Sequence, residues 1–461
     1  MGENPHWKNM KKVRNLQMKK LLALLLALVM VVALAACGVT TENAAPASSG
    51  SQEPAADSGS AAGGITLFNG KIEIADALNH AAEVYEAATG KHVEVNSVGG
   101  GVDLQSELKQ RYQAGNMPDI FTCEGTPDFS NWTDNEMLVV DMSDQPWVSD
   151  TEAEFVYEPT GAVIGFPYTT EAIGLAYNKS ILDAAGIDPA SITGPESMKA
   201  AFEKLDGMKD ELGITAVIGW CANAKELYWS TGNHMFCNYL DAGLARDDST
   251  YFDLMMDEGK LDLDRFTPFA EMVGLFNQYS DPALLVSGNY DLQVSGFASG
   301  KYAFVTQGSW IGASLTGQYK DLYAAAGNFE CGMIPYAFIE GIDTILTNPP
   351  SHWAVYKNGN VAEAEEFLQW LAGPDGQQIM VQEAGLNSPF KSCTVVANDP
   401  FAPTVADFTA RGKTSSWHFL EQPANMAEDY TGAIFQDYAM GTITTEEFIQ
   451  DMVDTIPNAV K

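Results

Sequence analysis

The chain has 461 residues and carries 25 Lys and Arg against 61 Asp and Glu, which gives a formal net charge of −36. Nucleic-acid binding needs clustered basic side chains that contact phosphates, so this balance excludes nucleic-acid-binding proteins. The first 36 residues carry a net charge of +5, and the remainder therefore reaches −41. Such an acidic chain is compatible with a domain outside the cell that anionic lipid does not attract.

The N-terminal segment is typical of an export signal. Residues 21–36 form an apolar run of 16 residues directly after Lys19 and Lys20. A membrane-spanning helix needs about 20 apolar residues, so we expect a signal peptide over residues 1–36. Met18 precedes the two lysines as in a typical bacterial signal, which makes it an alternative translation start. The competing interpretation is an uncleaved signal anchor.

The junction Leu-Ala-Ala-Cys at residues 34–37 resembles the lipobox of bacterial lipoproteins. This resemblance implies that Cys37 receives a diacylglyceryl thioether, becomes the mature N-terminus and anchors the protein, since two or more acyl chains anchor stably. The following tract is rich in Ala, Ser, Gly, Pro and Thr, a composition that does not fold. We therefore expect residues 37–63 to be the lipidated Cys and a flexible linker.

The next segments alternate between strand and helix patterns. We expect strands at 65–68, 91–96 and 120–122 and amphipathic helices at 74–88 and 102–114. This βαβαβ opening predicts an α/β fold with a parallel sheet and helices on both faces. Such sheets bind ligands outside the carboxyl ends of their strands. The remaining length is enough for two lobes.

Further along, short motifs follow one another in a characteristic order. They are Ala-Gly-Asn-Met-Pro-Asp-Ile (114–120), Gly-Phe-Pro-Tyr (165–168), Leu-Ala-Tyr-Asn-Lys (175–179), Phe-Ala-Ser-Gly-Lys-Tyr-Ala-Phe (297–304), Gln-Gly-Ser-Trp (307–310), the segment 362–376 and Gly-Thr-Ile-Thr (441–444). The order and spacing of these motifs resemble those of the family 1 extracellular solute-binding proteins. These are the maltose-binding-protein-like lipoproteins that feed sugar importers of the ABC type. The resemblance runs from about residue 65 to the C-terminus.

The resemblance implies a two-lobed periplasmic-binding-protein-like fold of type II, with a ligand cleft between lobes joined by hinge crossings. Lobe 1 is expected to take residues 64–170 and 351–395. Lobe 2 is expected to take residues 171–350 and 396–461. Closure of two lobes is a hinge-type switch, and a ligand that touches both lobes stabilises the closed state.

Motifs of enzymes and metal sites are absent from the sequence. We find no Gly-x-Ser-x-Gly, no His-Glu-x-x-His and no EF-hand loop, and the six histidines show no ligand spacing. We therefore expect no catalytic residue, metal or cofactor. Five cysteines follow Cys37, namely Cys123, Cys221, Cys237, Cys331 and Cys393. They match no zinc pattern, which leaves buried free thiols or one disulfide, Cys221–Cys237, as alternatives.

Aromatic residues are the main candidates for ligand binding on lobe 2. A pyranose has an apolar C–H face that an indole covers, while amides and acids bind its hydroxyl groups. The family often has an aromatic side chain in the turn that holds Trp310, which implies a stacking floor there. The other candidates are Trp220, Asn223, Tyr228 and Trp229, with His352 and Trp353 at a hinge crossing and Trp417 and Tyr430 as weaker ones. Core packing is the alternative for every tryptophan.

Polar residues are the candidates on lobe 1. Asn69 follows the first strand, and a turn role before a glycine is its alternative. Glu124 and Asp128 follow the 120–122 strand, where the family commonly binds sugar. Glu171 follows the first hinge piece and corresponds to an acid that meets sugar in maltose-type members. A hydrogen-bonded brace of the hinge is the alternative for Glu171.

These features together predict a membrane-anchored solute-binding lipoprotein on the outer face of a bacterial plasma membrane. It would capture a carbohydrate, an oligosaccharide, by lobe closure and deliver it as a monomer to an ABC transporter permease. A polyamine or other cation is the alternative ligand, since aromatic side chains also bind cations. A cell-surface glycoside hydrolase is the alternative from another class. It needs two carboxylates about 5–9 Å apart, and the sequence names no such pair.

Overall fold

The computed structural model describes residues 64–99, 103–423 and 425–461. The expected signal peptide, Cys37 and the linker to residue 63 lie outside the described residues. Within the described ranges, every helix is too short or too polar to cross a membrane.

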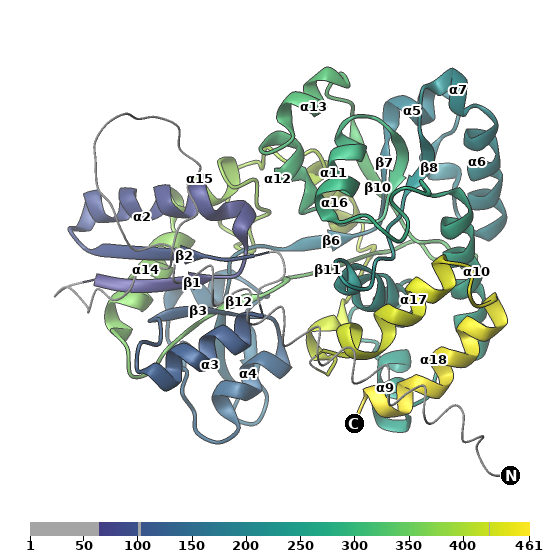
Figure 1. Cartoon of the computed structure of the whole chain (residues 1–461). Coiled ribbons are helices and arrows are strands. Elements are labelled where there is room, and N and C mark those ends of the chain that lie inside the picture. The colour runs from purple at the N-terminus through teal and green to yellow at the C-terminus, as the bar shows by residue number, and fades with distance from the viewer. Residues whose placement is uncertain (1–63, 100–102, 424) are drawn as a thin grey trace, which may run out of the picture. The chain divides into compact units, whose positions relative to one another are not determined.

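A six-stranded sheet forms the centre of the first lobe (Figure 1). Its strands, in spatial order, are β2 (His92–Ser97), β1 (Gly64–Asn69), β3 (Ile120–Cys123), β12 (His352–Val355), β5 (Ala162–Pro167) and β4 (Phe155–Tyr157). The expected strands near residues 65, 91 and 120 are confirmed, and β1 pairs in parallel with both β2 and β3. The expectation of a parallel sheet was wrong for the other half of this sheet, because β12, β5 and β4 pair with their neighbours in antiparallel orientation.

Helices cover both faces of this sheet. Successive side chains of a strand point to opposite sides, and here both sides carry apolar side chains that the helices bury. Leu67 of β1 packs with one core and Phe68 with the other. The first core includes residues of α2 (Ala75–Thr89), α14 (Val361–Ala372) and α15 (Pro374–Gln382), and the second includes residues of α3 (Leu104–Ala114) and α4 (Thr126–Thr133). The short helices η1 (Ile72–Ile74) and η2 (Pro146–Asp150) complete this lobe.

A four-stranded sheet forms the centre of the second lobe. Its spatial order is β10 (Cys331–Ile334), β7 (Leu175–Asn178), β9 (Tyr302–Val305) and β8 (Ala216–Gly219). Its helices are α5 (Lys179–Ala184), η3 (Pro189–Ser191), α6 (Pro195–Gly207), α7 (Lys209–Leu212), η4 (Trp229–Met235), α8 (Phe236–Asp241), α9 (Thr250–Glu258), α10 (Leu263–Tyr279), α11 (Tyr290–Ala298), α12 (Ile311–Thr316), α13 (Lys320–Ala325), α16 (Ala402–Ala410), η5 (His418–Glu421), η6 (Ala427–Thr431), α17 (Gly432–Ala439) and α18 (Thr445–Ala459). Two large apolar clusters fill this lobe.

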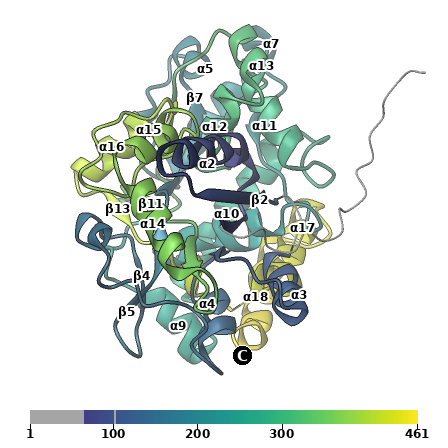
Figure 2. The same cartoon turned by 90° about the vertical axis from the view of Figure 1, so that its left-hand side faces the viewer.

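A third, small sheet joins the two lobes. It contains β6 (Glu171–Ile173), β11 (Ile345–Asn348) and β13 (Thr414–Ser415), in the order β13-β11-β6. The strands β6 and β11 run side by side between the lobes in Figure 1, and in Figure 2 α2 and β2 of the first lobe lie in front of α10 and α12. The chain passes from β5 to β6 through residues 168–170 and from β11 to β12 through residues 349–351. The two-lobed α/β fold expected from the resemblance is therefore present.

The five described cysteines are all free, and all but Cys393 are buried. The alternative of a Cys221–Cys237 disulfide was therefore wrong. Cys221 donates its thiol to the carbonyl of Leu284 at 3.1 Å, while Cys237 lies near the amide of Gln422. The two thiols thus belong to different contacts inside the second lobe.

Candidate functional site

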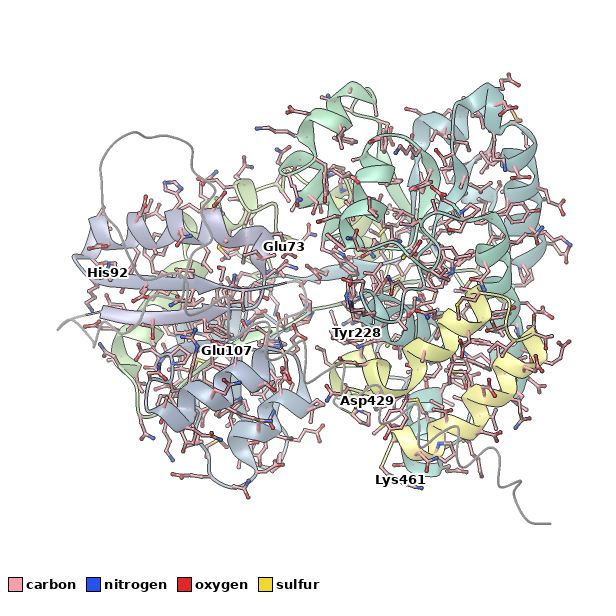
Figure 3. All side chains as sticks on the ribbon, in the orientation of Figure 1. Glu73, His92, Glu107, Tyr228, Asp429 and Lys461 are labelled. Carbon is pink, nitrogen blue, oxygen red and sulfur yellow. The ribbon has the colours of Figure 1, made fainter. Side chains whose placement is uncertain are left out.

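A pocket lies where the two lobes and the crossing strands meet. Its lining residues are Lys71, Glu73, Thr169, Glu171, Ser309, Trp310, Ala313, Gly385, Leu386, Asn387 and Asp399. It encloses about 260 Å³, the open space at its mouth included. Lys71 follows β1 by two residues, so the pocket lies at the carboxyl end of that strand, as α/β sheets predict. Figure 3 shows Glu73 of the first lobe and Tyr228 of the second on facing edges.

A buried ion pair crosses this pocket. Lys71 Nζ lies 2.5 Å from Glu171 Oε1 and 2.8 Å from Glu73 Oε1. Burial opposes the charge on Lys71, but Glu171 and Glu73 outweigh it and raise the Lys71 pKa. Burial raises the pKa of Glu171 against the pull of Lys71. Because Lys71 belongs to the first lobe and Glu171 begins β6, the pair braces the crossing and lines the pocket at the same time.

A second buried acid also lines the pocket. Asp399 is 5% exposed and accepts a hydrogen bond from the backbone N–H of Phe401 at 3.0 Å. Burial raises its pKa to about 7, against the effect of that bond and of a hydrogen bond with Asn387. The backbone carbonyl of Asn387 accepts from Thr170 N at 2.9 Å, so this side of the pocket also holds the crossing segment.

Aromatic rings of the second lobe form a wall beside the pocket. We call Trp229, His234, Trp310, Trp417 and Phe419 the aromatic wall. The ring of His234 lies 4.8–5.3 Å from the other four rings, centroid to centroid, and meets each of them edge to face. Trp310 and Trp417 are nearly parallel at 14°, with their centroids 6.3 Å apart. Trp310 is the member of the wall that lines the pocket itself.

A π-helix places two members of the wall on one side. The segment η4 is a π-helix, in which hydrogen bonds join residue i to residue i+5. Residues five apart therefore lie one above the other, and Trp229 and His234 come within 5.1 Å. A second π-helix, η6, supports the first, since Thr431 Oγ1 donates to the carbonyl of Gly232 at 2.8 Å.

His234 is a neutral histidine in this wall. Burial, together with the charge of Lys71, lowers its pKa to about 3. Its Nδ1 atom is buried and meets no hydrogen-bond partner among the described residues. It lines a second pocket together with Ser230, Gln307 and Trp310.

Glu124 lies in the loop after β3, and Asp128 lies in the first turn of α4. Asp128 Oδ2 accepts from the backbone N–H of Glu124 at 2.8 Å and from Gln105 Nε2 at 2.9 Å, so this carboxylate holds the start of α4. The surrounding protein and the charge of Asp128 raise the pKa of Glu124 to about 7, although the side chain keeps an exposed face. Between them, Gly125 approaches Leu420 of the second lobe so closely that an added Cβ would lie 2.1 Å from its carbonyl oxygen.

Two other polar candidates hold turns. The Asn69 amide donates to Lys71 O at 2.8 Å and to Ser97 Oγ at 3.0 Å, and its oxygen accepts from Lys71 N at 3.3 Å. Asn69 thus shapes the turn that presents Lys71. Asn223 donates to Gly288 O at 2.8 Å and accepts from Lys225 N at 3.1 Å, which fixes the loop before η4.

Three candidates lie in the cores of the lobes and belong neither to the pocket nor to the aromatic wall. Trp220 is 0% exposed and donates its indole N–H to Asn277 Oδ1 at 2.7 Å. Trp353 is also 0% exposed and stacks on Tyr168 with centroids 4.3 Å apart. His352, likewise buried, makes a hydrogen bond from Nε2 to Ala153 O at 2.8 Å. The structure therefore brings Trp310 and Glu171 to the pocket, Trp229 to the wall and Tyr228 to the facing edge, but not these three.

Sequence reasoning missed several residues of the pocket and the wall. Lys71, Glu73 and Asp399 line the pocket, and His234 and Phe419 belong to the wall. The position of Lys71 just after the first strand was a usable signal, because ligands bind at that edge. His234 carried none, since a π-helix is rare and its pattern was not expected.

Comparison with known proteins adds a family and a set of similar folds. Residues 80–406 match the model of a family described as bacterial extracellular solute-binding protein. The melibiose/raffinose/stachyose-binding protein MelE of Bacillus subtilis (strain 168) is 23% identical over 364 residues, which cover 76% of this chain and 79% of MelE.

Solved structures with a similar fold include the following two. A sugar transporter from Bacillus licheniformis in complex with stachyose has a TM-score of 0.66 at 17% identity, and the match covers 86% of this chain and all of that one. A chitin oligosaccharide binding protein has a TM-score of 0.69 at 17% identity, with 86% and 98% of the two chains covered. At these identities the likeness concerns the fold.

Proposed function

The chain belongs to the bacterial extracellular solute-binding protein family, and on this premise we propose that it captures a carbohydrate, an oligosaccharide, between its two lobes. The observation that carries the proposal is the pocket that combines one indole with polar groups from both lobes. Trp310 supplies a flat apolar face, while Glu171, Asn387 and Thr169 supply hydrogen-bonding groups around it. This is the combination that a pyranose needs, an apolar cover for its C–H face and polar partners for its rim.

The relatives support a sugar as the ligand. MelE is described as binding melibiose, raffinose and stachyose, and one similar structure holds stachyose. A ligand that touches Trp310 and Lys71 or Thr169 contacts both lobes or their crossing. It therefore favours the closed arrangement, because a ligand stabilises the state in which it makes more contacts.

The acids of the pocket favour binding over catalysis. Glu171 and Glu73 both contact Lys71. The third acid of the pocket, Asp399, accepts a hydrogen bond from the Phe401 N–H, so none of the three is a free carboxylate beside a scissile bond. A glycosidase needs a pair of acids with opposed roles on one bond. A polyamine would have to share Glu171 and Glu73 with the Lys71 ammonium, so a neutral ligand is the better fit.

We also propose that the protein is a lipoprotein anchored through Cys37 on the outer face of the plasma membrane, and that it delivers its ligand as a monomer to an ABC transporter permease. Anchoring would keep the lobes near the permease while the linker lets them reorient. We expect Cys37→Ala to lose membrane association or to remain unprocessed. Fractionation of cells that carry either form measures this, and an unchanged, fully processed membrane fraction would refute the anchor.

A binding screen tests the proposed ligand class. Purified protein carrying Cys37→Ala is heated with raffinose, stachyose, melibiose, chitin oligosaccharides or spermidine, and each mixture is checked for products. A true ligand at about 100 times its Kd adds ~2.7 kcal/mol to the free energy of unfolding and raises the Tm. Cleavage of a sugar at enzyme-like rates would overturn the proposal. A Tm rise with spermidine and with no sugar would replace the carbohydrate by a cation.

A further inference from the structure

Two buried glutamines connect Trp310 to the centre of the second lobe. Gln307 is 2% exposed and Gln293 is 0% exposed. Trp310 Nε1 donates to Gln307 Oε1 at 2.9 Å, and Gln307 Nε2 donates to Gln293 Oε1 at 2.9 Å. Gln293 Nε2 then donates to the carbonyl of Gly219, at the end of β8, at 2.7 Å. The indole is thus tied through two side chains to the end of a core strand.

The direction of this relay is fixed by its ends. An indole N–H donates only and a backbone carbonyl accepts only. Gln307 must therefore turn its oxygen to Trp310 and its NH₂ to Gln293, and Gln293 must do the same toward Gly219. Each amide has one orientation that satisfies both neighbours. A flip of either one would place two acceptors or two donors face to face in a buried site, which is costly.

Gln307 is also joined to the π-helix of the aromatic wall. Its Nε2 lies 3.3 Å from Ser230 Oγ, and Ser230 lies in η4 between Trp229 and His234. One side chain therefore contacts Trp310 directly and the segment that carries Trp229 and His234. Ser230 and Gln307 are 77 residues apart in the chain, and their contact links the η4 part of the wall to Trp310.

We propose that Gln307 and Gln293 are positioning residues that set the orientation of the Trp310 ring for ligand stacking. The proposal rests on the proposed function, since it assumes that Trp310 covers a sugar. The relay holds the ring near its parallel position beside Trp417 while the lobes open and close. An indole ring that is already held in place loses less conformational entropy when the ligand binds. A loosely held ring loses more, and the protein then binds the ligand more weakly.

The chain offers a matched control for this bond. Trp220 makes the same indole-to-amide hydrogen bond, to Asn277 at 2.7 Å, but in the core. Gln307→Leu and Asn277→Leu each leave an indole N–H without its acceptor, so both are expected to lower the Tm. We expect only Gln307→Leu to weaken raffinose binding by the folded protein, about tenfold. Equal affinities for the two variants would overturn the proposal.

A second readout does not depend on the ligand. In protein labelled with ¹⁵N-tryptophan, the indole N–H signal of Trp310 is identified by its loss in Trp310→Phe. We expect Gln307→Leu to shift this signal and speed its hydrogen exchange, whereas Asn277→Leu leaves it unchanged. If wild-type protein binds no sugar of the panel, the proposed function fails, but this signal still decides whether the relay holds Trp310. An unchanged signal in Gln307→Leu would refute the relay.

A pH profile separates positioning from general stability. In Gln307→Glu, the protonated carboxyl group has one O–H donor and one acceptor and can replace the amide in the relay. Burial raises the pKa of such a carboxyl group. At about pH 5 we expect the ratio of variant to wild-type affinity to be near one, and at about pH 9 we expect it to fall, because the carboxylate then faces Gln293 Oε1. A ratio that does not change with pH would overturn the proposal, and this variant also serves if Gln307→Leu does not fold.

Discussion

At the scale of single residues, the surroundings of a side chain decide its role more than its chemical type does. Trp310 is half-buried beside the pocket, whereas Trp220 is 0% exposed and packs against Phe276 and Phe435. Both indole N–H groups are satisfied by a side-chain amide. The two residues differ in their surroundings. Trp310 lines the pocket, whereas Trp220 is enclosed by apolar neighbours.

Truncation of these two residues is expected to have opposite consequences. Trp310→Ala should weaken sugar binding by ~1–3 kcal/mol, the range for loss of a good aromatic contact, and affect stability less. Trp220→Ala should lower the free energy of unfolding by ~3–5 kcal/mol, because it opens a core cavity, and leave affinity unchanged. Calorimetric titration and urea unfolding measure the two quantities. If Trp310→Ala mainly destabilised the fold and bound sugar normally, Trp310 would belong to the core.

The Lys71–Glu171 pair gives a prediction about pH. In Lys71→Met the buried Glu171 loses its cation, so its pKa, already raised by burial, rises further. The folded state then holds a proton that the unfolded state releases, so stability is highest at low pH and falls as pH rises through the folded-state pKa. We expect a loss of ~3–5 kcal/mol at neutral pH that shrinks toward about pH 5, measured by urea unfolding.

Lys260→Met serves as the control for this variant. Lys260 and Glu258 form an ion pair at 2.7 Å, but their side chains are 66% and 55% exposed. Water replaces such a partner at little cost, so stability should hardly change at any pH. A similar loss in both variants, or a loss in Lys71→Met that grows on acidification, would contradict the buried ion pair.

At the scale of elements, the two π-helices depend on each other. Gly232 of η4 meets the end of η6 and the start of α17 so closely that an added Cβ would lie 2.4 Å from Thr431 Oγ1 and 2.7 Å from Gly432 N. Thr431 in turn donates to the carbonyl of Gly232. The absence of a side chain at Gly232 allows the contact between the two π-helices, and this contact supports the π-helix that places Trp229 and His234 next to each other.

Gly232→Ala is therefore expected to push the two π-helices apart. We expect a loss of ~1–3 kcal/mol in stability from overpacking and a weaker affinity for sugar, because Trp229 and His234 shift. Gly207→Ala is the matched control at the end of α6, where an added Cβ meets nothing within 4 Å. Gly207→Ala should be neutral or slightly stabilising. Equal effects in the two variants, measured by unfolding and titration, would show that the π-helix contact is unimportant.

At the scale of the whole molecule, the lobes meet at a second place besides the crossing strands. Gly125, in the loop after β3, has φ +92° and touches the backbone of Leu420 in η5, the short helix that follows Trp417. Only glycine fits, because a Cβ would overlap the carbonyl oxygen of Leu420. This contact brings the edge of the first lobe against the segment that carries part of the aromatic wall.

We expect Gly125→Ala to hold the lobes further apart and to weaken sugar binding roughly tenfold, which corresponds to ~1.4 kcal/mol. Gly161→Ala is the control, since Gly161 has φ +72° and an added Cβ there meets nothing within 4 Å. Both variants carry the strain of a positive φ, but only Gly125→Ala carries the clash. Small-angle scattering measures the radius of gyration. An equal radius and equal affinity in the two variants would exclude a role in closure.

Local patterns of the sequence predicted the first elements and the family. The strands and helices from β1 to β3 follow from apolar periodicity, which each segment carries by itself. The ordered motifs, including the turn with Trp310, indicated a two-lobed solute-binding protein, and the family match confirms this. The position of the pocket at the carboxyl end of β1 follows from the same local patterns, because a parallel βαβ unit fixes where its strands end.

Tertiary structure alone decided which candidates reach the pocket. Lys71 pairs with Glu171, which lies 100 residues further along the chain. Gly232 contacts Thr431 at a separation of 199 residues, and the Trp220 indole binds Asn277 at a separation of 57 residues. A periodic pattern tells which face of an element is apolar, but not which distant segment will cover it. Burial, charge and hydrogen bonding of a side chain depend on those distant neighbours, and so the sequence determined the elements while the packing determined the site.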